Sequence, residues 1–143
     1  MTSRDTHKEH IREHKQELAD AISIGIQKRP ITIGFHTSAC SIDLLELYLH
    51  VLGKISSGTI IKHEWFKTPE QGQKTVARAE QKLPVVFLHK ERILELLYII
   101  EGERNKLIYG KPPLHTIEAV LRAFNELYIL IKEELEKQGE EIE

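Results

Sequence analysis

Apolar residues recur at helical spacing along most of this chain, and the pattern predicts a series of α-helices. The first spans about residues 3–28 and ends before Pro30, because the residue before a proline avoids helical backbone angles. The second spans about residues 31–52 and is apolar on nearly all sides in its second half. A helix of that kind is either buried at the centre of its own domain or covered by a second subunit.

Three further helices are predicted beyond the loop that follows Gly53. Residues 68–82 predict a mostly polar helix, whereas residues 85–109 and 114–137 predict two long helices with apolar stripes. A Pro-Pro pair separates the last two, because proline cannot continue a preceding helix. Strict alternation of apolar and polar residues, which would indicate strands, is weak and confined to short runs.

Length and composition suit one globular domain, since the chain has 143 residues, of which 41% are hydrophobic and 29% are charged. We therefore predict an all-α fold, an antiparallel bundle of about five or six helices in a single domain over residues 1–143. The acidic tail from about residue 138 is expected to fray. Many Glu, Lys and Ile residues with few Asn, Gln and Met are typical of a protein from a thermophile.

The cysteine count, the lengths of the apolar runs and the net charge indicate where the protein is located and what it could bind. The single cysteine, Cys40, excludes a disulfide framework within the chain and fits a reducing compartment. No apolar run reaches the length of a membrane span and no signal-peptide pattern occurs, so we expect a cytoplasmic protein that does not bind membranes. The net charge of −2 does not indicate a basic nucleic-acid surface over the whole domain, although a local basic patch is compatible with it.

The candidate functional residues lie near the end of the predicted helix 85–109. Arg104 and Asn105 are adjacent there, and Tyr109 follows just before Gly110. A guanidinium and a phenol supply donors suited to a phosphate or a carboxylate. On residue types alone, the stretch also fits an ordinary helix C-terminus in which Gly110 follows the last turn and Arg104 makes a surface ion pair.

The run from Arg104 to Gly110 resembles the signature of the HEPN superfamily, the "higher eukaryotes and prokaryotes nucleotide-binding" helical domains. That signature is an Arg, usually a polar residue next, and a His four to six residues further on, near the end of a four- or five-helix bundle. Arg104 and Asn105 match it, whereas Tyr109 stands where the histidine belongs. In active members the Arg and His form a metal-independent endoribonuclease site, usually across a dimer interface. The resemblance implies a HEPN-like homodimer with Arg104, Asn105 and Tyr109 at the catalytic positions.

The resemblance also implies an acidic or polar residue from an earlier helix beside Arg104. Asp43 and Glu46 of the second predicted helix are the acidic candidates. His50 follows Asp43 by seven residues and therefore shares its helix face, which makes it a third supporting candidate. The alternative is that these polar side chains only hydrogen-bond within the fold.

Basic and aromatic residues suggest where nucleic acid could bind. Lysine and arginine recur at i, i+4 and i+8 in the predicted helix 68–82, and this stripe consists of Lys74, Arg78 and Lys82. It is a candidate phosphate-backbone surface, with a solvated helix face as the alternative. The Lys62–His63 pair beside Trp65 and Phe66 would serve nucleic acid by charge and stacking, or the aromatics fill the end of the bundle.

Three histidines in the first predicted helix raise the question of a metal. His10 to His14 matches the His-x-x-Glu-His string of inverted zinc peptidases, and His7 lies nearby. Nothing like the downstream acidic ligand segment of those enzymes follows. We therefore predict no metal site and no cofactor.

Three functions remain open. A non-catalytic or weakly active HEPN-like module that binds RNA, a nucleotide or a partner protein is favoured, because Tyr109 replaces the motif histidine and a phenol is in general a poorer base at neutral pH than an imidazole. The second is a metal-independent endoribonuclease of toxin–antitoxin or RNA-processing type, and the third an unrelated helical dimer with a structural role. The resemblance also implies a nucleotidyltransferase-type protein as a partner.

Overall fold

A computed structural model describes residues 4–56, 58–67 and 78–142 of the chain. Their regular elements are α-helices α1 (Arg4–Ile24), α2 (Pro30–Val51), α3 (Arg78–Lys82), α4 (Lys90–Tyr109) and α5 (Leu114–Lys137), with 3-10 turns η1 (Ile26–Lys28) and η2 (His63–Phe66). No strand occurs in these described ranges, which confirms the all-α prediction. Within the same ranges, no helix is long and apolar enough to cross a membrane.

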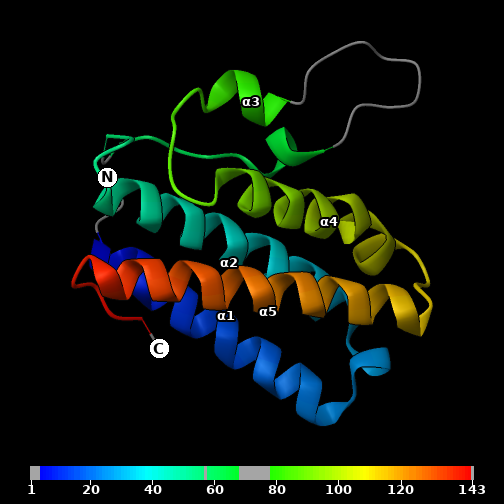
Figure 1. Ribbon diagram of the computed structural model, residues 1–143. Helices are drawn as coiled ribbons and strands as arrows, with labels where there is room; N and C mark the ends of the chain where they lie inside the picture. The colour runs from blue at the N-terminus through cyan, green and yellow to red at the C-terminus, as the bar shows by residue number, and fades with distance from the viewer. Residues whose placement is uncertain (1–3, 57, 68–77, 143) are drawn as a thin grey trace.

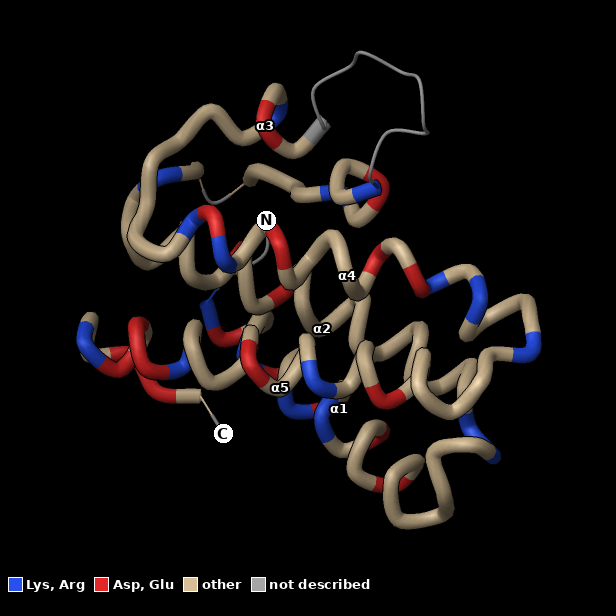
Figure 2. The backbone as a smooth tube through the Cα atoms, turned by 45° about the vertical axis from the view of Figure 1, so that its right-hand side comes forward, with Lys and Arg blue, Asp and Glu red and all other residues tan. Residues whose placement is uncertain are grey.

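The four long helices form the bundle, and each runs opposite to the long helix that precedes it in the chain (Figure 1). α2 is central and packs against α1, α4 and α5. The 3-10 turn η2 packs on the outer side of α4, and α3 packs against η2 (Figure 1). Acidic and basic residues are interspersed along the helices, in keeping with the net charge of −2 (Figure 2).

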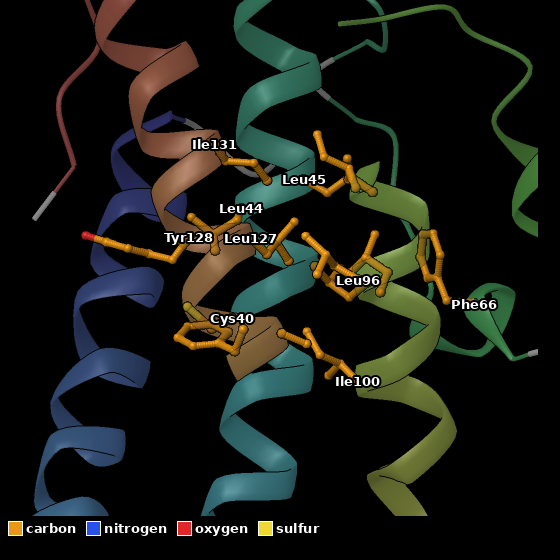
Figure 3. Close-up of a cluster of buried hydrophobic side chains, with 14 of the residues drawn as sticks. Cys40, Leu44, Leu45, Phe66, Leu96, Ile100, Leu127, Tyr128 and Ile131 are labelled. Carbon is orange, nitrogen blue, oxygen red and sulfur yellow. The ribbon is translucent and has the colours of Figure 1, made fainter. Parts of the chain in front are cut away.

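The core explains why α2 is apolar on nearly all sides. Leu44 and Leu45 of α2 meet Leu96 of α4 and Leu127 of α5 (Figure 3), and all four side chains are buried. Burying each such side chain contributes about 1.5–3 kcal/mol. Because neighbours from the same chain surround α2, its composition requires no second subunit, and the homodimer stays a prediction.

A close approach of α2 and α4 positions the end of α4. Gly34 faces α4, and a Cβ atom at Gly34 would lie 2.7 Å from Leu107 Cβ and 3.1 Å from Ile108 Cγ1. The same Cβ would lie 3.5 Å from the carbonyl oxygen of Arg104. The absence of a side chain at Gly34 thus lets the last turns of α4 lie directly against α2.

α4 begins five residues later than the sequence predicted. His89 precedes it with a φ of 65°, a left-handed conformation that interrupts a helix at a non-glycine residue. The Lys90 ammonium donates to the carbonyl oxygens of Leu83 at 3.0 Å and Val85 at 2.6 Å. The bond to Val85 uses a carbonyl group that a helix over residues 85–89 would have used, and both bonds stabilise the non-helical segment.

Other boundaries also differ. α1 ends at Ile24, because Gly25 has a φ of 131° that only glycine adopts readily, and η1 follows as a separate turn. The predicted helix 68–82 is represented by α3 alone, since residues 68–77 lie outside the described ranges. α5 spans the predicted range almost unchanged.

The acidic tail, which we expected to fray, packs against α1. Its Glu140 carboxylate pairs with Arg4 Nη1 at 2.7 Å and with Lys8 Nζ at 2.8 Å. Ile142 is buried against the core. Two cations and one apolar contact therefore hold a segment that its composition alone would leave in solvent.

Candidate functional site

A cleft of about 820 Å³ lies where the η2 segment crosses α2 and α4, and we call it the Arg104 cleft. Its walls come from α2, the segment through η2, α3 and the last turns of α4. The lining residues are Phe35, Ser38, Ala39, Ile42, residues 61–65, Lys82 and Arg104.

Arg104 provides an unsatisfied hydrogen-bond donor at this cleft. The Arg104 Nε atom is buried and has no hydrogen-bond partner, and the guanidinium makes no ion pair with any described residue. A buried N–H without a partner is costly, and an anion in the cleft would satisfy it through charge-assisted hydrogen bonds. Lys62 and Lys82 add two exposed positive charges to the lining.

A buried carboxylate orients a histidine in the same cleft. Glu101 lies one turn before Arg104 on α4, and its side chain is only 1% exposed. One carboxylate oxygen accepts a hydrogen bond from the Ser38 hydroxyl, and the other lies 3.0 Å from His63 Nδ1. Because a carboxylate accepts, His63 Nδ1 is the donor, and the ring is fixed with its Nε2 atom on the opposite side.

The other ring nitrogen of His63 contacts a second carboxylate. His63 Nε2 lies 2.9 Å from Glu64 Oε1, and Glu64 is 49% exposed. Both residues line the Arg104 cleft. The cleft therefore holds an arginine whose Nε atom has no partner among the described residues, an oriented histidine and a carboxylate that solvent can reach.

Of the three motif positions, only Arg104 lines this cleft. Asn105 and Tyr109 are both exposed, and the Tyr109 side chain is 78% exposed. Five positions along an α-helix correspond to a rotation of about 140°, which directs Tyr109 away from the face that carries Arg104. Tyr109 therefore does not occupy the place of an acid–base group beside Arg104 within one chain.

Asp43, a predicted supporting residue, faces α1. Its Oδ1 atom lies 3.1 Å from His7 Nδ1 and 3.3 Å from His10 Nδ1, and its Oδ2 atom lies 3.5 Å from His14 Nε2. Burial opposes ionisation of Asp43, but hydrogen bonds from these three histidines outweigh it and lower the pKa to about 2. Asp43 thus stabilises the α1–α2 contact and does not line the Arg104 cleft.

The other two supporting candidates lie on the same side of α2. Burial raises the pKa of Glu46 to about 7, against the opposing influence of His7. His50 Nε2 lies 2.9 Å from the carbonyl oxygen of Ser56, to which it donates, and its ring is 5.2 Å from that of His7 between centroids. His7 of α1 therefore lies beside both side chains.

The histidines of α1, which raised the possibility of a metal site, contact side chains of α2. The histidines of α1 converge on one carboxylate, that of Asp43, and His14 Nδ1 also meets His36 Nδ1 at 2.8 Å. Among the residues that the structure describes, no group of three or more His, Cys, Asp or Glu side chains is arranged to hold a metal ion. The His-x-x-Glu-His string is here part of a helix–helix contact.

The predicted basic stripe is described only in part. Lys74 and the side chain of Arg78 lie outside the described residues, whereas Lys82 is exposed and lines the Arg104 cleft. Of the two aromatics, Phe66 is fully buried and Trp65 is half-buried in the cleft wall. The aromatic pair therefore both fills the core and forms part of the candidate site.

Sequence reasoning did not identify Glu101 or Ser38. Neither stands out in the sequence, since Glu101 is followed by Gly102 and Glu103, and Ser38 lies between Thr37 and Ala39. Nothing in the sequence indicated that both meet His63, which lies 38 residues before Glu101.

Comparison with models of known protein families, with curated protein sequences and with solved structures finds no match.

Proposed function

We propose that the protein is a HEPN-like module that binds the phosphate groups of RNA or of a nucleotide in the Arg104 cleft. The observation that carries this proposal is the buried Arg104 Nε atom, which lacks a hydrogen-bond partner among the described residues and belongs to a cleft-lining side chain. A phosphate oxygen there would accept charge-assisted hydrogen bonds from the guanidinium.

The rest of the cleft suits the same ligand. Lys62 and Lys82 are exposed cations that would contact flanking phosphates. Trp65 and Phe35 supply aromatic surface on which an unpaired base could stack, a common mode of single-strand recognition. The volume of about 820 Å³ falls within the range of about 300–1,000 Å³ usual for small-ligand pockets.

A homodimer and a nucleotidyltransferase-type partner are proposed on the HEPN resemblance. Ile31 and Phe35, one turn apart on α2, are 60% and 47% exposed and offer apolar surface for a second copy beside the cleft. We retain the cytoplasm as the proposed location because of the single reduced cysteine.

The proposal is tested by fluorescence anisotropy of a short, end-labelled single-stranded RNA. Arg104→Ala should weaken binding about 10- to 100-fold, the effect of losing a hydrogen bond to a charged group. Arg122→Ala removes the same charge from an exposed site on α5 and should change affinity less than about twofold. Equal affinity for all three folded proteins, or no binding by the parent, would contradict the proposal.

RNA cleavage is a second candidate, and the His63–Glu101 pair favours it. Once Glu64 has moved away and the Nε2 proton of His63 has passed to solvent, Nε2 could accept the proton of a ribose 2′-hydroxyl next to a phosphate held by Arg104. The 2′-oxygen would bond to phosphorus, the bond from phosphorus to the 5′-oxygen would break, and that oxygen would take a proton from solvent. The products would be a cyclic phosphate and a free 5′-hydroxyl.

His63 would then supply the base that Tyr109 cannot. His63→Gln should abolish cleavage of an RNA probe while retaining most of the binding. His115→Gln, at an exposed position on α5, is the matched control and should leave cleavage unchanged. If the parent binds RNA but never cuts it, the binding function stands and the catalytic candidate is rejected.

A further inference from the structure

Glu64 occupies the position in which the cleft would meet an anion. Its carboxylate oxygen lies 2.9 Å from His63 Nε2, and both residues line the cleft together with Arg104. An acidic residue in this place opposes phosphate binding, because it adds negative charge where a phosphate would approach.

The two carboxylates that flank His63 are held very differently. Glu101 is 1% exposed and uses both oxygens, one with Ser38 and one with His63 Nδ1. Glu64 is 49% exposed, and among the described residues its carboxylate contacts only His63 Nε2. Glu101 is therefore a fixed support, whereas the side chain of Glu64 can rotate into solvent without breaking any other described contact.

The histidine cannot turn away from Glu64 to meet a ligand. Rotation of the His63 ring would break the hydrogen bond of Nδ1 to the buried Glu101 and leave that carboxylate short of a partner. A ligand oxygen can therefore accept a hydrogen bond from His63 Nε2 only after it displaces the Glu64 carboxylate. Both nitrogens face carboxylates, so each satisfies its partner only by donating a proton, and the same Nε2–H would serve a phosphate.

We propose that Glu64 is an autoinhibitory residue, a carboxylate of the chain itself that occupies the phosphate position at His63 until a ligand displaces it. This inference rests on the proposed function and adds a means of regulating the same site. Binding exchanges a weak, solvent-exposed ion pair for contacts of a phosphate with His63 and Arg104. Any change that removes the charge of Glu64 or draws it toward solvent would therefore raise the affinity for RNA.

Glu64→Gln tests this directly, because it removes the charge and keeps the shape. In the anisotropy assay it should bind the same RNA about 2- to 5-fold more tightly than the parent, the upper range of an exposed ion pair. Glu118→Gln makes the same change of net charge at an exposed site on α5 and should leave affinity unchanged.

A double-mutant cycle separates local displacement from general electrostatics. If Glu64 acts through His63, the gain from Glu64→Gln should disappear in a His63→Gln background. A gain that persists there, or that Glu118→Gln reproduces, would overturn the proposal, as would a parent that binds RNA through Arg104 with no gain in Glu64→Gln.

Failure of the proposed function gives a different result from failure of the autoinhibition proposal alone. If neither the parent nor Glu64→Gln binds RNA, both proposals are rejected together. If the parent binds, Glu64→Gln binds more tightly, and Arg104→Ala abolishes binding in that background, both are supported.

Discussion

Replacing Gly34 by alanine should destabilise the protein and disturb the Arg104 cleft, although alanine is the better helix former. The added Cβ would lie 2.7 Å from Leu107 Cβ, closer than real Cβ contacts allow, and 3.1 Å from Ile108 Cγ1. Both neighbours belong to α4, and Leu107 is fully buried, so α4 must move away from α2. Overpacking of this kind costs about 1–3 kcal/mol.

Gly102→Ala is the matched control. Gly102 lies within α4, and a Cβ there would meet nothing within 4 Å. Both substitutions gain about 1 kcal/mol of helix propensity, so the difference between the two variants isolates the steric cost of about 1–3 kcal/mol.

The assay is thermal and urea unfolding of the two variants beside the parent. Gly102→Ala should unfold above the parent, and Gly34→Ala roughly 3–10 °C below Gly102→Ala for a domain of this size. Gly34→Ala should also bind RNA more weakly, because the clash with Leu107 displaces the turn of α4 that carries Arg104. If the two variants unfold together, α2 and α4 do not meet at Gly34, and the placement of Arg104 is wrong.

Two further predictions concern buried titratable groups. Burial raises the pKa of Glu46 from 4.5 to about 7, so the stability tied to its proton is present below pH 4.5 and lost as the pH rises through 7. Glu46→Gln should therefore match the parent in urea unfolding below pH 4.5 and exceed it by ~1–3 kcal/mol above pH 7, whereas parallel pH profiles would contradict the assignment. Burial also raises the pKa of the Cys40 thiol, so a thiol reagent should label Cys40 only as fast as the protein unfolds; rapid labelling of the native protein would show that the site is open.

The sequence predicted the helices well where apolar periodicity was continuous. α2 and α5 fall within a residue or two of their predicted ranges because proline sets their starts. The start of α4 was misplaced because two tertiary hydrogen bonds from Lys90 hold residues 83–85 extended, and no local pattern reports such bonds.

The candidate site was predicted only in part. Arg104 was identified by a local motif, but its neighbours in the cleft come from α2 and from the segment through η2. Asp43 contacts the histidines of α1, and an apolar helix does not reveal from its sequence which neighbour faces each polar residue. His63 and Glu101 meet only through tertiary packing. They are 38 positions apart, and no periodic pattern in the sequence predicts their contact.

The most direct test observes the Arg104 Nε–H group by nuclear magnetic resonance while RNA is added. Phosphate binding in the Arg104 cleft should shift the Nε–H resonance of Arg104 and slow its exchange with water, because a buried donor without a partner acquires one. The Nε–H of Arg92, already bonded to Glu126, should not move. If RNA binds to saturation while the Arg104 resonance stays fixed, the ligand lies elsewhere and the proposed function of this cleft is wrong.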